Sequence, residues 1–60
     1  KQMLYLTVLN FETNKTTTYK SYDLSKWQYE ECEQFLTSKG HDLKICTWMI
    51  HNKETELINL

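Results

Sequence analysis

The sequence contains no alanine, no arginine and no proline, and its only glycine is Gly40. GC-rich codons specify these four residue types, whereas the AT-rich set (Phe, Tyr, Met, Ile, Asn and Lys) supplies 22 of the 60 residues. The bias indicates a gene from a low-GC genome, such as those of many phages, plasmids and low-GC bacteria. It also argues against an idealised designed protein, which would use Ala and Arg freely in its helix.

Other absences argue against whole classes of function. The chain has no glycine-rich loop, so it cannot cradle a phosphate in the manner of a P-loop or dinucleotide-binding protein. Seven lysines against eight acidic residues give a net charge of −1, and this balance without Arg argues against a generic nucleic-acid-binding protein. Because there is no apolar run of about 18 residues and no signal peptide, we expect no membrane association and a cytoplasmic location.

The length of the chain limits what it can build. Sixty residues form one domain, residues 1–60. A domain of this size buries only about 60% of the surface that its unfolded chain exposes, so aromatic side chains or a partner must help to stabilise it. We expect it to have no room for both a core and a deep substrate cleft of several hundred Å³. We therefore expect a protein that is not an enzyme.

The residues with catalytic or metal-binding chemistry are few and poorly spaced. Cys32 and Cys46 could form one disulfide, but in a cytosolic protein they are expected to be reduced, buried and apolar in character. His41 and His51 complete a possible zinc set, yet the short Cys-x2–4-Cys spacing of structural zinc sites is missing. A catalytic Cys32 is not expected either, because burial lowers thiol reactivity. The sequence therefore predicts no catalytic residues, no metal and no cofactor.

The first half of the sequence predicts a β-hairpin. Residues 3–11 are apolar on both alternating faces, which is typical of a central strand or of one covered on both sides. Residues 12–15 form a polar turn in which Asn14 can adopt a left-handed conformation. Residues 16–22 are rich in Thr and Tyr, which favour strands.

A helix is predicted over residues 25–38. Ser25 and Gln28 fit a capping box, with Asp23 as a competing cap, and Gly40 provides a left-handed stop. At about 100° per residue, one face of the helix is apolar. This face comprises Leu24, Tyr29, Cys32, Phe35 and Leu36.

A second hairpin is predicted after the helix. Residues 43–50 alternate as a strand, residues 51–54 form a polar turn, and residues 55–60 are a candidate last strand. The predicted fold is α+β, with a small antiparallel sheet packed on one helix. Its order is ββαββ, or ββαβ if the last strand frays.

One helix covers only one face of such a sheet, so the other face is expected to be an interaction surface. If Leu4, Leu6 and Val8 meet the helix, then Tyr5 and the other odd-numbered residues of this strand point away from it. In the third strand we expect Cys46, Trp48 and Ile50 to be uncovered, because Lys44 shares their face. Tyr19 is expected to join this surface. The alternative is that the aromatic side chains wrap the sheet edges and are structural.

The sequence therefore favours a non-enzymatic protein-binding module that acts through aromatic and acidic side chains. Its partner is expected to be a host protein or a second copy in a homodimer. The most specific form of this hypothesis is a phage or mobile-element factor that inhibits or redirects a host protein. One alternative is a single-stranded nucleic-acid-binding domain that uses aromatic stacking with Lys20 and Lys44. Another is a structural fragment of a larger assembly. The predicted partner-binding residues are Tyr5, Tyr19, Trp27, Glu30, Glu31 and Trp48.

Overall fold

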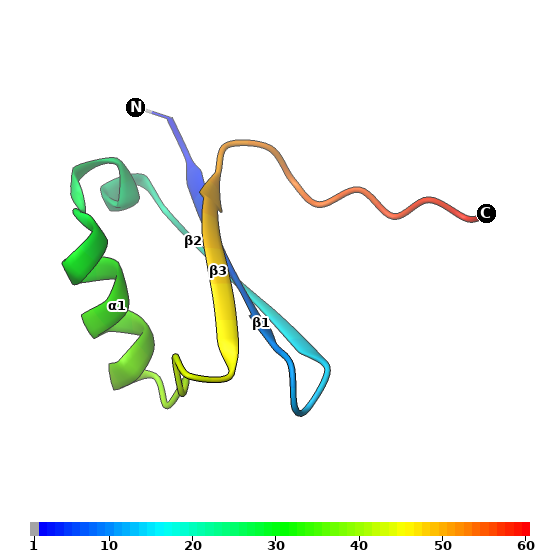
Figure 1. The fold of residues 1–60 in the computed structure, drawn as a ribbon. Helices are drawn as coiled ribbons and strands as arrows, with labels where there is room; N and C mark the ends of the chain where they lie inside the picture. The colour runs from blue at the N-terminus through cyan, green and yellow to red at the C-terminus, as the bar shows by residue number, and fades with distance from the viewer. Residues whose placement is uncertain (1) are drawn as a thin grey trace.

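A computed structural model describes residues 2–60 as a three-stranded sheet with one helix on one side (Figure 1). The sheet is antiparallel with β1 in the centre, in the order β2-β1-β3. The predicted α+β class, with a small antiparallel sheet and one helix, is confirmed. In chain order the elements are β1 (Leu4–Asn10), β2 (Lys15–Ser21), the 3-10 helix η1 (Tyr22–Lys26), α1 (Tyr29–Ser38) and β3 (Cys46–His51).

The predicted first hairpin is present, with its turn at residues 11–14. The side chain of Asn10 accepts hydrogen bonds from the backbone N–H groups of Glu12 and Thr13, both at 2.9 Å. Asn14 has a φ of 59°, the left-handed conformation that Asn tolerates better than most residues. An asparagine therefore favours the turn at each end, Asn10 through its side-chain hydrogen bonds and Asn14 through its left-handed backbone.

The helix begins four residues later than the sequence pattern predicts. Ser25 is not its cap, because the chain around it forms η1, which Ser21 caps by accepting the Asp23 backbone N–H at 3.0 Å. The capping box instead pairs Gln28 with Glu31, whose carboxylate accepts the Gln28 N–H at 2.9 Å. The tighter 3-10 turn buries Leu24 in the core, which the sequence pattern attributes to α1.

The predicted helix stop is confirmed. Gly40 has a φ of 91°, and its N–H donates to the carbonyl of Thr37 at 3.0 Å. The N–H of His41 donates to the carbonyl of Leu36 at 3.0 Å, which completes a Schellman motif.

The third strand is shorter than predicted. Asp42 turns the chain, because its carboxylate accepts the Lys44 N–H and its carbonyl accepts the Ile45 N–H, both at 3.0 Å. Residues 43–45 therefore belong to this turn, and β3 begins at Cys46.

The predicted last strand is not formed. Residues 54–60 carry no strand assignment and are exposed throughout. In Figure 1 this segment runs away from the sheet on the side opposite α1. Its apolar residues alternate between two faces, Leu57 on one and Ile58 and Leu60 on the other. A strand paired with β3 at the edge of the sheet could bury only some of these apolar side chains against α1. Pairing the segment with β3 would therefore add little to the stability of the monomer.

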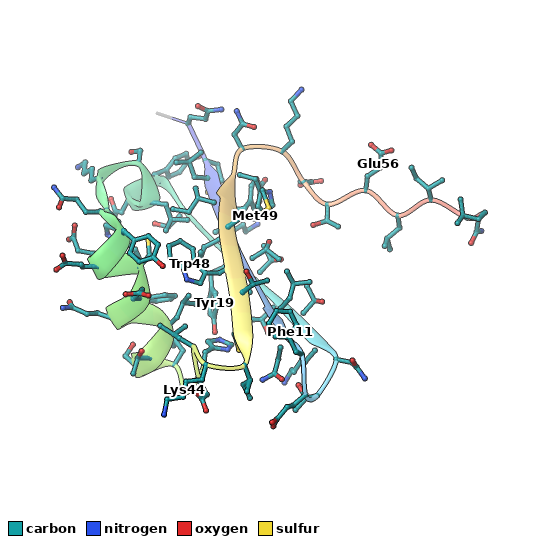
Figure 2. All side chains as sticks on the ribbon, in the orientation of Figure 1. Phe11, Tyr19, Lys44, Trp48, Met49 and Glu56 are labelled. Atoms are coloured by element: carbon teal, nitrogen blue, oxygen red, sulfur yellow. The ribbon has the colours of Figure 1, made fainter. Side chains whose placement is uncertain are left out.

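The core lies between the sheet and the helical elements. Leu6 and Leu36 are fully buried, and Val8 is 1% exposed. The register pairs Val8 with Trp48 and Leu6 with Tyr19, and paired residues share a face of the sheet. Trp48 and Tyr19 therefore lie on the α1 side (Figure 2), and their predicted place on the uncovered face is wrong.

The wrong prediction of which face of β3 meets solvent has a physical reason. The exposed Lys44 lies in the turn before β3, so it does not fix which face of the strand meets solvent. Burying Trp48 and Ile50 against α1 also removes more apolar surface from water than burying their neighbours Thr47 and Met49 would.

Within residues 2–60, no helix is both long and apolar enough to cross a membrane.

Candidate functional site

The face of the sheet opposite α1 carries exposed apolar side chains. Leu9 is 40% exposed, Met49 is 56% exposed, and Phe11, just beyond β1, is 65% exposed. The register places Leu9 and Met49 on adjacent strands as diagonal neighbours. We call this surface the open face, and on the three strands it comprises Tyr5, Thr7 and Leu9, then Thr16, Thr18 and Lys20, then Thr47, Met49 and His51.

A chain of hydrogen bonds crosses the open face from β2 to β3. The Thr7 hydroxyl lies 2.9 Å from the Thr18 hydroxyl and 2.6 Å from Nε2 of His51. Nδ1 of His51 lies 2.6 Å from the carbonyl of Lys53, and because a carbonyl only accepts, Nδ1 carries the hydrogen. In the neutral ring, Nε2 then accepts from Thr7. The His51 ring also stacks on Tyr5 with centroids 5.4 Å apart, so this end of the open face is held rigidly.

A second surface lies between the edge strand β2 and α1. Residues 19–21 form one wall, Leu24 and Trp27 the end, and Phe35 and Lys39 the other wall, around a volume of about 340 Å³. We call it the β2–α1 groove. It unites two of the predicted partner-binding residues, Tyr19 and Trp27.

The aromatic side chains of the β2–α1 groove support one another. Phe35 contacts Trp27 with ring centroids 5.2 Å apart and meets Tyr19 edge-on at 4.9 Å. The Tyr19 hydroxyl lies 2.7 Å from Nε2 of His41, which fixes the ring. The ammonium of Lys39 lies 5.6 Å from the Phe35 centroid, so one rim of the groove carries a cation above an aromatic floor.

The other predicted partner-binding residues are dispersed. Trp48 lies on the helix side of β3, where Tyr29 covers it with centroids 5.1 Å apart. Glu31 is engaged in the helix cap. Glu30 lies on the exposed surface of α1, and Tyr5 is half-buried on the open face. The structure therefore does not unite the six residues in one site.

Sequence reasoning missed some members of both surfaces. The prediction of a strand from residue 43 places Met49 on the covered face, because it assigns the face of Lys44 to solvent. In the structure residues 43–45 form a turn, so Lys44 does not indicate which face of β3 is exposed. The alternation with Leu6 and Val8 places Leu9 and Phe11 on the uncovered face, but neither is among the predicted partner-binding residues. The proximity of Lys39 to the groove depends on how α1 packs beside β2, and no pattern in the sequence reveals this packing.

The two cysteines are part of the buried interior of the protein. Cys32 is 1% exposed, and burial raises the pKa of its thiol, with a further rise from the Glu31 carboxylate. Both cysteines are free and buried, as the sequence predicts.

In the part of the chain that the structure describes, no three His, Cys, Asp or Glu side chains are arranged to hold a metal ion.

Comparisons with models of protein families, with curated proteins and with solved structures find no match for this chain. Function is therefore inferred from the side chains and their surroundings.

Proposed function

We propose that this chain is a non-enzymatic protein-binding module whose contact surface is the open face. The observation that carries the proposal is the exposure of Leu9, Phe11 and Met49 on a sheet face without helix cover. Aromatic side chains and Met are enriched in the cores of protein interfaces, and large contiguous exposed apolar patches are uncommon on monomers. A rigid floor made by the Tyr5–His51 stack reduces the entropy lost on binding.

The partner that suits this surface is an apolar patch on another protein. The open face carries one lysine, Lys20, and no carboxylate, so ion pairs contribute little and the exposed side chains of Leu9 and Met49 offer the main apolar contact. An interface of standard size needs about 800 Å² from each partner, which a small domain can supply. The low-GC composition supports the more specific proposal of a phage or mobile-element factor that inhibits or redirects a host protein in the cytoplasm.

The single-stranded nucleic-acid alternative receives less support. Tyr19 and Trp48, two of the aromatic side chains that would stack on bases, lie on the α1 side of the sheet. Lys44 lies in the turn before β3, away from the open face. On the open face and just beyond it, Tyr5, Phe11 and Lys20 remain for such a role among residues 2–60. A steep loss of nucleic-acid affinity with added salt would support that alternative.

The proposal is tested by capture from a low-GC bacterial lysate with immobilised wild-type chain and two matched variants. Met49→Lys places a charge on the β3 part of the open face, opposite Thr7, whereas Gln34→Lys places the same charge on the exposed surface of α1. The expected result is a protein retained by the wild type and by Gln34→Lys but lost with Met49→Lys. Loss with both variants, retention by both, or no retained protein would contradict the proposal. Equal thermal stability of the two variants is the folding control.

A further inference from the structure

The chain exposes more surface than is typical of a folded monomer of its mass. Its accessible area is 5019 Å², whereas a folded monomer of 7.3 kDa exposes about 4,200 Å². The excess, about 800 Å², is similar to what one partner buries in a standard interface. Part of it comes from residues 54–60, where Leu57 is 94% exposed and Ile58 is 69% exposed.

Segment 54–60 has the properties of an unpaired strand. It has the seven-residue length of β2, it contains no Gly or Pro, and in Figure 1 it is extended. One of its alternating faces carries Glu54, Glu56, Ile58 and Leu60, and so combines acidic and apolar side chains. Figure 2 shows Glu56 far from the folded body, so this face meets nothing within its own chain.

The β2–α1 groove is complementary to that face. β2 is an edge strand, so alternate residues direct backbone N–H and C=O groups outward where another strand can bind. A strand added there places alternate side chains over the groove, in which Trp27 and Phe35 offer an apolar surface. Lys39 at the rim offers a positive charge to an acidic residue. The groove and the segment therefore match in backbone, in apolar character and in charge.

We propose that residues 54–60 of one copy of this chain bind as an added strand to β2 of a second copy. Ile58 and Leu60 then cover the aromatic floor of the β2–α1 groove, and Glu56 meets Lys39. A reciprocal exchange of the two segments gives a closed twofold dimer in which each contact occurs twice. This self-association uses a different surface from the open face, which stays available to another protein.

The first test is the solution mass by light scattering, across a concentration series, of the wild type, Lys39→Glu and Glu56→Lys. The wild type is expected to approach twice 7.3 kDa. Each variant alone is expected to weaken association by about tenfold, because a twofold dimer repeats each like-charge contact. An equimolar mixture of the two variants is expected to restore it, since both charge contacts of the mixed dimer again pair a carboxylate with an ammonium. Lys44→Glu, an exposed lysine outside the groove, is the matched control and should associate like the wild type.

The second test is Ile58→Pro, which removes one backbone donor and an apolar side chain from the exchanged strand. It should abolish association while leaving the thermal unfolding of the dilute monomer unchanged, because Ile58 is exposed on a segment that runs away from the sheet.

A monomeric mass for the wild type at every concentration would overturn the inference. So would association that persists in Lys39→Glu, Glu56→Lys and Ile58→Pro, or a mixture that fails to restore the dimer. None of these outcomes affects the open-face proposal, which depends on Met49 and is measured by capture of another protein.

Discussion

At the residue scale, polar side chains in this small domain position other groups. His41 fixes Tyr19 in the β2–α1 groove, and His51 connects the hydroxyl of Thr7 to the carbonyl of Lys53. The bond to Lys53 ties the backbone to His51 of β3 just before segment 54–60 begins. Both histidines thus have structural roles on surfaces that we propose for binding. No buried side-chain nitrogen or oxygen among residues 2–60 lacks a hydrogen-bond partner.

The thiol of Cys32 gives a prediction that depends on pH. Burial raises its pKa in the folded state, so the folded protein retains this proton after the unfolded chain has lost it. Below the ordinary thiol pKa, about 8.5, both states are protonated and the contribution to stability is constant. Above that pH the free energy of unfolding should fall, because the unfolded chain binds fewer protons.

The measurement is chemical unfolding of the wild type and Cys32→Ala across pH 7 to about 10. The alkaline decline should be smaller in Cys32→Ala, which lacks the thiol. In parallel, iodoacetamide should modify Cys32 slowly in the native protein and rapidly in denaturant. Equal rates in the two conditions would show that the thiol is accessible in the fold.

At the element scale, the start of α1 shows how two good local signals compete. Both Ser25 with Gln28 and Gln28 with Glu31 fit the spacing of a capping box. The tertiary structure selects the later one, because a 3-10 turn before it brings Leu24 into the core and Trp27 against Phe35. The start of α1 is therefore set by packing.

The helix start can be tested with three alanine variants. Glu31→Ala removes the acceptor of the Gln28 N–H and should lower the free energy of unfolding by about 1 kcal/mol. Ser25→Ala, at the cap position that the sequence predicts, should cost under about 0.5 kcal/mol. Glu30→Ala is the control for loss of an acidic residue in the first turn. Denaturant titration measures all three, and a larger cost for Ser25→Ala would place the helix start at residue 25.

At the scale of the whole molecule, a compact body and an exposed segment coexist. The three strands and α1 enclose a small core of Leu, Val and Cys side chains, while residues 54–60 contribute nothing to it. The two surfaces that we propose for binding, the open face and the β2–α1 groove, lie on different sides of the sheet. Both are exposed because a single helix covers only part of the sheet.

Limited proteolysis should reveal this division. A glutamate-specific protease should cleave after Glu54 and Glu56 before it cleaves after Glu30, Glu31 or Glu33, because α1 must open before its backbone fits a protease. Mass spectrometry of a time course identifies the order of cleavage. At high protein concentration, the strand exchange that we propose should slow cleavage after Glu56. Simultaneous cleavage at all five positions would show that α1 is not stably folded.

Elements whose signals are local could be predicted from the amino-acid sequence. The hairpin turn follows from Asn14, and the helix stop follows from Gly40, because these residues tolerate left-handed backbone better than others. The alternation along β1 groups Leu4, Leu6 and Val8 on one face, and the folded chain places that face against the helix. The α+β class follows from these patterns, and Tyr5 is correctly predicted to lie on the uncovered face.

Features that depend on contacts between distant residues emerged only from the folded chain. Either face of β3 could be apolar by its own pattern, and pairing with β1 selected Trp48 and Ile50 for burial because Leu6 and Val8 opposite them face α1. The groove exists because η1 and α1 bring Trp27 and Phe35 beside Tyr19. The last strand, predicted from its own residues, has no partner in the monomer. A strand needs a neighbour to satisfy its backbone, and local sequence cannot supply one.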